Sequence, residues 1–484
     1  MNIRVSTPFI IAFILGSSFV RAQALPPDGA APPAEVPPAP PPEAEPPAPP
    51  VQEEPPAEAT APPEVAPEAA APPASPVEAA PPIDPAPPVP VPEPAMAAEA
   101  PPADAPPAAT ITGAPGDGLT VSVGEKFSLN VKSRFQIRYQ LDIPREDDAG
   151  ERDLQQIATI QTARVYLGGF VYTPKLTYQL QLAVAGRDYR DGATSPVYDA
   201  YLDYKMHRDL SARVGQYFVP FDRLRTVKES ALQMADRPRP IGEFTLDRDV
   251  GLTLYSNNFL GDESPVAWRL GVFGGGGTNL TVGREPAALV VGRLELRPLG
   301  PIDDDSEGDL ARREKPGLAL GGGFANNWNT NRVRSTTGAT YVGGTTDYTH
   351  AAVDLVFKWM GFAFQAEHLW RNASEDEILS TDEEGEPVTE YTRSGRAWIL
   401  QASYAFDPPV EVVGRVSRMY ASNDTDPALV SEVDARGDEL GAGLNYYING
   451  HKLKVQADWI ARMPTGFELK EADHVTHLLL DATF

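Results

Sequence analysis

Apolar and polar residues alternate with a period of two along the C-terminal three quarters of the chain. Between residues 126 and 141 the apolar face carries Phe127, Leu129, Val131, Phe135, Ile137, Tyr139 and Leu141, with polar side chains between them. Side chains alternate across a β-strand, so this segment predicts a strand with one apolar face. Its sixteen residues exceed the five or six that are typical of globular proteins, and they suit a strand that crosses a bilayer at a tilt.

The same pattern recurs often enough to predict a complete barrel. The expected strands are 126–141, 161–172, 176–187, 196–205, 210–219, 249–257, 266–274, 287–297, 316–327, 347–359, 361–371, 395–406, 410–421, 437–448, 452–462 and 474–484. Only a closed barrel lets strands satisfy every backbone hydrogen bond in lipid. We therefore predict an all-β fold over residues 116–484, a transmembrane antiparallel β-barrel of about sixteen strands in a bacterial outer membrane.

The connections between these strands alternate in length. Short ones are 173–175, 206–209, 407–409 and 449–451, and long, polar ones are 142–160, 220–248, 328–346, 372–394 and 422–436. Short periplasmic turns opposite long external loops are typical of outer-membrane barrels. Residues 298–315 do not fit, because they are long where a short turn is needed. The chain ends on Phe484 after an alternating segment, which resembles the assembly signal of bacterial outer-membrane proteins.

Two segments precede the expected barrel. Residues 1–24 combine Arg4, the apolar run 9–20 and a small-residue end at Ala24, which indicates a secretory signal peptide. Residues 25–115 hold most of the 51 prolines, with Ala and Glu and without aromatic residues. Proline fixes φ and removes an amide donor, so this segment predicts a disordered, extended periplasmic linker. It could be a plain spacer, or it could bind peptidoglycan or a periplasmic partner.

The remaining composition excludes several functions. A formal charge of −26 disfavours nucleic-acid binding, and the absence of cysteine excludes disulfides and thiolate chemistry. His474 and His477 are three residues apart on a strand, so they point to opposite faces and cannot share a metal ion. No catalytic motif is recognised, so we expect no enzyme activity, no cofactor and no metal.

Several segments resemble the phosphate-selective porin O and P family. They are 163–169, 199–204, 213–221, 248–251, 413–418 and 440–448, in the family's order. The resemblance implies a sixteen-stranded barrel, usually a homotrimer, that conducts small anions such as phosphate. The proline-rich segment is not part of this pattern.

Positive residues on the polar faces of the strands are the candidate pore lining. On the first strand these are Lys126, Lys132, Arg134 and Arg138, and on later strands Arg164, Arg213 and Arg415. A cationic file in a low-dielectric wall favours anions. Alternatively, these side chains pair with interior acids and only fill the wall. The available acids are Asp199, Asp203, Glu295, Asp354, Glu367, Glu411 and Asp458.

The long loop 220–248 is the candidate constriction, because the third long loop of porins of this size commonly folds inward. It carries Arg223, Arg225, Lys228, Arg237 and Arg239 beside several acids. Alternatively it is an external flap with balanced charge. The leading hypothesis is a passive outer-membrane porin with anion preference, in contact with lipid. The alternative is a structural protein that tethers the membrane to the cell wall through residues 25–115.

Overall fold

The computed structural model describes residues 108–146, 150–189, 195–261, 264–279, 287–303, 305–382, 384–407 and 409–484. The chain divides into two compact units at Ala97, and every described residue belongs to the second. The predicted signal peptide and nearly all of the predicted linker lie outside the described residues. Within those residues, no helix has both the length and the apolar character needed to cross a membrane.

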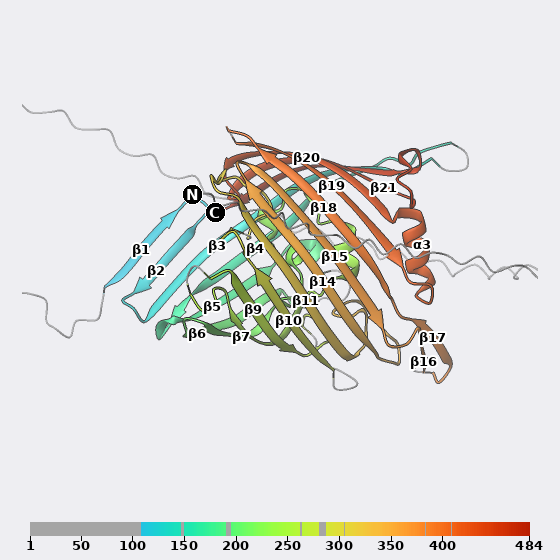
Figure 1. The fold of residues 1–484 in the computed structure, drawn as a ribbon, viewed down its shortest axis with the longest axis horizontal. Helices are drawn as coiled ribbons and strands as arrows, with labels where there is room; N and C mark the ends of the chain where they lie inside the picture. The colour runs from blue at the N-terminus through green and yellow to red at the C-terminus, as the bar shows by residue number, and fades with distance from the viewer. Residues whose placement is uncertain are drawn as a thin grey trace, which may run out of the picture. The chain divides into compact units, whose positions relative to one another are not determined.

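Sixteen antiparallel strands form a closed barrel, which confirms the predicted fold (Figure 1). The strands are β3 (Phe127–Ile143), β4 (Gln155–Val171), β5 (Thr173–Ala183), β6 (Val197–His207), β7 (Leu210–Phe218), β8 (Arg248–Ser256), β9 (Val266–Phe273), β10 (Ala288–Leu296), β11 (Gly317–Thr330), β14 (Thr346–Trp359), β15 (Phe362–Ala373), β18 (Gly395–Ala405), β19 (Val410–Ala421), β20 (Asp438–Asn449), β21 (Leu453–Met463) and β22 (Asp473–Thr483). Each pairs with the next, and β22 pairs with β3 from His474 opposite Ile143 to Thr483 opposite Arg134. This last pairing closes the barrel and removes the free edges of the sheet.

The two faces of the barrel wall carry opposite kinds of side chain. On β3, Phe135, Ile137 and Tyr139 are exposed, whereas Gln136 and Arg138 are buried. A water-soluble protein shows the reverse, with apolar side chains inside. The wall therefore presents its apolar face outward and its polar face to the lumen, as the alternation predicts.

A short hairpin before the barrel was not predicted. Its strands are β1 (Ala109–Ala114) and β2 (Gly118–Val123), and β2 pairs with the first residues of β3, from Phe127 to Val131. That part of β3 extends past the end of β22, since Phe484 bonds to Ser133 through both backbone groups. The hairpin occupies the edge that β22 leaves free. The predicted linker boundary at residue 115 therefore falls inside ordered structure.

The two ends of the barrel differ. One end, here called the turn end, carries the hairpin, the C-terminus and the short connections (Figure 1). The other, the loop end, carries long connections that contain η1 (Gly186–Tyr189), η3 (Leu469–Glu471), α3 (Pro427–Arg436), the hairpin of β12 (Arg332–Arg334) and β13 (Thr337–Thr340), and the hairpin of β16 (Glu377–Thr381) and β17 (Pro387–Tyr391). The connection between β3 and β4, expected over residues 142–160, is shorter than predicted because β4 begins at Gln155.

Two connections turn into the lumen. The inner loop (219–247) follows β7 and contains α1 (Arg223–Thr226), η2 (Glu229–Ala231) and α2 (Arg239–Phe244). Its apolar residues, among them Phe221, Ile241 and Phe244, form the main buried cluster together with inward residues of the strands. The turn-end insertion (298–315) follows β10 at the opposite end. These two segments decide which part of the lumen remains open.

Candidate functional site: the barrel lumen

The inner loop enters the lumen against the β10–β15 wall. Asp222 caps α1 by accepting a hydrogen bond from the Arg225 amide, with 3.1 Å between N and Oδ1. Arg223 donates to Asp354, with 2.8 Å between Nε and Oδ1, and also pairs with Glu295. Gly323 on β11 permits this approach, because a Cβ there would lie 2.2 Å from the carbonyl oxygen of Phe221.

The middle of the inner loop is bonded to the β18–β21 wall. Gln233 donates to Glu411, with 2.6 Å between Nε2 and Oε1. Lys454 donates to the carbonyl of Leu232 at 2.7 Å, and the amide of Ala235 donates to Asp458 at 2.6 Å. These partners belong to strands spread over the far side of the barrel. The inner loop therefore fills that side of the lumen and cannot be an external flap.

The turn-end insertion meets the inner loop inside the barrel. Glu307 accepts a hydrogen bond from the Gln233 amide at 2.7 Å and another from Gln401 at 3.0 Å. Lys358 on β14 donates to the carbonyls of Asp303 and Ser306 at 2.6 and 2.8 Å. The unexpected length of this connection is thus used to fill the lumen from the turn end and to support the inner loop.

An open cavity of about 590 Å³ remains between the inner loop and the β3–β10 wall. Basic side chains outnumber acidic ones in its lining. The basic residues are Lys132, Arg134, Arg213, Arg223, Lys228, Arg237, Arg248, Arg269 and Arg293, and the acidic ones are Asp199, Glu229, Glu295 and Asp305. Fixed positive charges stabilise an anion more strongly in such a confined space than they would in bulk water.

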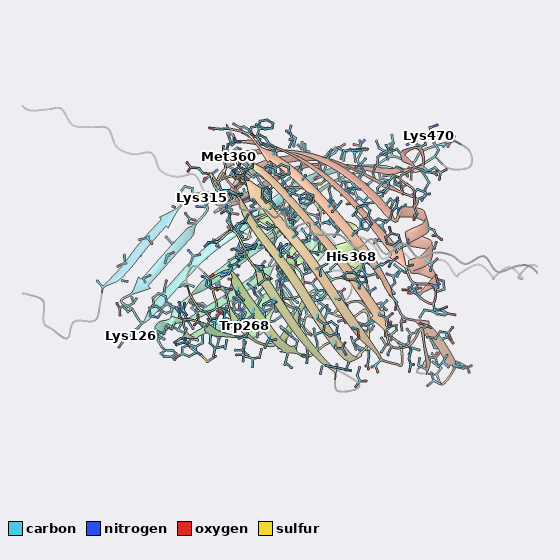
Figure 2. All side chains as sticks on the ribbon, in the orientation of Figure 1. Lys126, Trp268, Lys315, Met360, His368 and Lys470 are labelled. Atoms are coloured by element: carbon cyan, nitrogen blue, oxygen red, sulfur yellow. The ribbon has the colours of Figure 1, made fainter. Side chains whose placement is uncertain are left out.

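The four predicted pore cations of the first strand differ in location and in their partners. Lys126 lies before β3 begins and is exposed in the turn after β2, so it does not line the pore as predicted (Figure 2). Arg134 pairs with Asp481 at 2.7 Å and with Glu229 at 3.4 Å. Arg138 pairs with Asp236 at 2.7 Å. Only Lys132 faces the cavity without a carboxylate within 4 Å among the described residues, and its ammonium lies 5.7 Å from the Tyr166 ring centre.

The predicted arginines on later strands are also paired. Arg164 pairs with Asp188 of η1, and Arg213 pairs with Asp203 at 2.6 Å. Arg415 lies 2.9 Å from Glu439 and donates to the carbonyl of Asp236 at 2.8 Å. Each of these side chains therefore has an acidic partner, and Asp203 is one of the interior acids named above. Their charges fix the wall and the inner loop, and they contribute less to the field in the cavity.

The inner-loop cations divide in the same way. Arg225 pairs with Asp247, and Arg239 pairs with Glu432 of α3. Arg237 lies 4.0 Å from a carboxylate oxygen of Glu229 and donates to the carbonyl of Leu224 at 3.0 Å. Lys228 lines the cavity, and no carboxylate of the described chain lies within 4 Å of it. Of the predicted site residues that reach the cavity, Lys132 and Lys228 are the two whose charges are not neutralised by a direct partner.

One acid at the cavity remains charged over a wide pH range. Burial of Glu229 opposes its ionisation, but the guanidinium groups of Arg134, Arg237 and Arg164 outweigh burial and lower its pKa to about 2. Its charge therefore persists opposite Arg134 and keeps that cation from acting as an isolated positive charge.

The sequence analysis missed an arrangement of arginines and aromatic rings in the cavity wall. Arg248 lies 3.7 Å from the ring centre of Tyr198 and 3.6 Å from that of Phe218. Arg213 lies 4.3 Å from the ring centre of Tyr201. These contacts hold the guanidinium groups against rings on β6 and β7. The family-like segments 199–204, 213–221 and 248–251 contain four of these five residues, but nothing local indicated that they meet.

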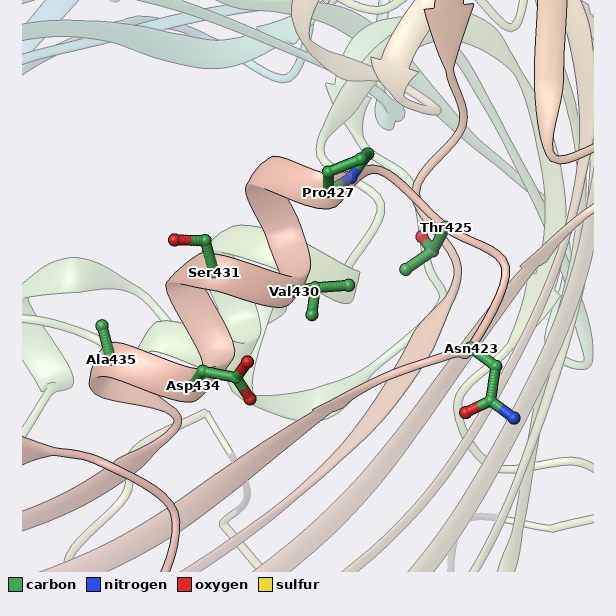
Figure 3. Close-up of a pocket in the computed structure, with 7 residues that line it drawn as sticks. All are labelled: Asn423, Thr425, Pro427, Val430, Ser431, Asp434 and Ala435. Atoms are coloured by element: carbon green, nitrogen blue, oxygen red, sulfur yellow. The ribbon is translucent and has the colours of Figure 1, made fainter. Parts of the chain in front are cut away.

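A second hollow lies beside α3 at the loop end, with a volume of about 620 Å³ (Figure 3). Its lining includes Thr425, Ser431 and Asp434 and contains no lysine or arginine. It therefore lacks the positive charge that distinguishes the lumen cavity. No group of three or more potential metal ligands occurs in the described part of the chain.

The match to a family model agrees with this architecture. The family model for phosphate-selective porin O and P matches residues 129–480. Among solved structures, the chain is similar to the outer membrane channel DcaP of Acinetobacter baumannii, at 13% identity and a TM-score of 0.45, covering 74% of this chain and 97% of that one. It is also similar to OmpF of Salmonella typhi, at 14% identity and a TM-score of 0.49, covering 74% and 98%.

A further similar structure is an anion-selective porin from Comamonas acidovorans, at 12% identity and a TM-score of 0.44, covering 74% of this chain and all of that one. A comparison with curated proteins found no match. The family match spans the whole barrel from β3 to β22, and the β1–β2 hairpin lies before it.

Proposed function

We propose that this chain, which belongs to the phosphate-selective porin O and P family of outer-membrane porins, conducts small anions in preference to cations. The observation that carries the proposal is the open cavity beside the inner loop, in whose lining basic residues outnumber acids. Within that lining, Lys132 and Lys228 supply positive charge that no direct carboxylate partner cancels.

The acidic character of the whole chain does not oppose this preference. Many acids lie in loop-end segments, such as Glu375, Asp376 and Glu377 beside β16. Charges in solvent act weakly beyond a Debye length of about 8 Å at physiological salt. Charges that line a narrow cavity act on the permeating ion at closer range and with less screening. The positive charge of the cavity lining therefore outweighs the negative charge of the surface in setting the ion preference.

Phosphate is one anion that such a lining would attract, because guanidinium and ammonium groups both bind phosphate oxygens. Most arginines here are already engaged by carboxylates, so the preference we propose is a general one for small anions, with phosphate included. A homotrimeric assembly is part of the proposal through family resemblance alone.

The two N-terminal segments complete the proposal. Residues 1–24 direct export and are removed, the proline-rich segment lies in the periplasm, and the turn end of the barrel faces the periplasm. This orientation follows the rule that short turns of outer-membrane barrels face the periplasm. The tether remains an alternative that no described contact favours.

The reversal potential of the purified protein, reconstituted in a planar bilayer under a KCl gradient, tests the proposal. We expect the sign that corresponds to greater chloride permeability. Added phosphate should reduce the chloride current, because it competes for the same cavity. A clear preference for potassium would refute the assignment of the cavity charges as dominant.

A further inference from the structure

A row of aromatic and basic side chains lies on the outer wall near the loop end. Trp370 of β15 is directly opposite Arg396 of β18, and Arg396 is directly opposite Tyr420 of β19. Their neighbours Ala397 and Met419 are buried, so the row points away from the lumen. His368, one row further from the loop end, lies on the same outer face (Figure 2). We call Trp370, Arg396 and Tyr420 the outer-wall row.

Arg396 is the cation of the outer-wall row, and it has no acidic partner among the described residues. It is exposed, and no carboxylate of the described residues lies within 4 Å of its guanidinium. Its recorded contact is with the Tyr420 ring, whose centre lies 5.2 Å away. The next row provides a comparison, because Arg418 there pairs with Asp438 at 2.5 Å and lies 4.7 Å from the Phe467 ring centre. The outward Arg418 is therefore neutralised by a carboxylate, whereas the outward Arg396 is not.

The depth of Arg396 places it at the edge of the apolar band. Tyr404, near the turn end of the same strand, also faces outward and contacts Phe406, with 4.9 Å between ring centres. Eight residues separate Arg396 from Tyr404, or roughly 26 Å along the strand and roughly 20 Å along the barrel axis at a usual tilt. Exposed Leu400 lies between them. Aromatic rings mark both interfaces of a membrane barrel, so Arg396 lies at the loop-end interface.

The donors of a guanidinium group at this position are poorly hydrated on the lipid side, and no carboxylate of the described residues lies within 4 Å of them. Anionic head groups are the partners available at that depth. We propose that the outer-wall row binds the phosphate head group of an outer-leaflet amphiphile, with Arg396 donating to the phosphate oxygens. Trp370 and Tyr420 pack beside the first atoms of its acyl chains. Arginine suits this ligand because its planar fork matches two phosphate oxygens.

The test is native mass spectrometry of the purified full-length protein in a mild detergent. The probe is bis-phosphorylated lipid A, and the comparison ligand is the same lipid after removal of its phosphates. The variant is Arg396→Gln. The matched control is Arg152→Gln, which removes the same charge from a loop-end arginine that pairs with Glu146 and lies off the outer wall.

We expect the wild type and the Arg152→Gln control to retain phosphorylated lipid A about tenfold more tightly than Arg396→Gln, as the loss of a charged hydrogen-bond donor implies. The dephosphorylated lipid should bind all three proteins equally. Inorganic phosphate at the same concentration should leave the lipid adduct in place. Displacement by inorganic phosphate would overturn the assignment to a lipid.

Two other outcomes would also overturn the proposal. One is equal retention of phosphorylated lipid A by the wild type and Arg396→Gln. The other is a loss of oligomer mass in Arg396→Gln with unchanged lipid retention, which would assign the row to a contact between copies of the chain.

Discussion

Replacing Lys132 and Lys228 together by glutamine should lower the anion preference of the channel. Both ammonium groups border the open cavity, and no carboxylate of the described chain lies within 4 Å of either. Neither substitution breaks an ion pair, so the inner loop should keep its position. The change therefore reports on the field in the cavity without disturbing the structure that creates the cavity.

The size of the effect follows from Coulomb's law. An anion about 8 Å from one ammonium group, one Debye length away, is stabilised by about 0.2 kcal/mol in bulk-water dielectric and by about 0.8 kcal/mol at an effective dielectric of about 20. Two lysines act together, and each stabilises an anion while destabilising a cation. The ratio of anion to cation permeability should therefore fall at least about fourfold, the value given by the lower energy.

The measurement is the reversal potential in a KCl gradient. The matched control is Lys315→Gln with Lys470→Gln, because both lysines are exposed at opposite ends of the barrel (Figure 2). The control removes the same charge and should change the ratio by less than about twofold, since distant charges are screened. Equal effects of the two double variants would refute the reasoning, because selectivity would then depend on overall charge.

Two further predictions concern how the lumen is held. Among the described residues, Arg134→Gln leaves the buried Asp481 with only its hydrogen bond from Gln136, and it should lower the free energy of unfolding by about 3–5 kcal/mol. The double variant Arg134→Gln with Asp481→Asn should recover much of this lost stability, because it removes both charges. Heat-dependent gel mobility measures the recovery, and its absence would mean that the two residues are not coupled. Gly323→Ala should displace the inner loop, because the new Cβ would lie 2.2 Å from the Phe221 carbonyl, and should raise single-channel conductance. Gly322→Ala is its control, with Ala352 O at 3.8 Å as the nearest atom, and equal conductance of the two variants would contradict this view of the loop.

The lengths, number and facing of the strands could be predicted from local pattern. A lipid-facing strand must alternate, and a barrel in lipid must close, so each strand of the sixteen carries its own evidence. The last strand shows this well, since its alternation up to Phe484 predicts the strand that completes the barrel against β3. The boundaries were less certain, as the early start of β4 at Gln155 shows.

The β1–β2 hairpin could not be predicted in the same way. Its strands have six residues each, interrupted by glycines and adjacent to the proline-rich segment, so their alternation is too short to stand out. The hairpin forms because β3 extends beyond the end of β22 and leaves a free edge. Which part of the β3 edge remains free is decided only when β22 pairs with residues 134–143 of β3.

The charges of the site show where sequence reasoning ended. The polar face of the first strand as predicted, residues 126–141, contains no acid, and this favoured Arg134 and Arg138 as free pore cations. Their partners come from elsewhere: Asp481 lies on the neighbouring strand, 347 residues later, and Asp236 lies in the inner loop. A strand's own residues determine which side chains face inward. Which inward charges remain to act on an ion is decided only when closure and the folded inner loop bring distant acids within bonding distance, leaving Lys132 and Lys228 at the cavity.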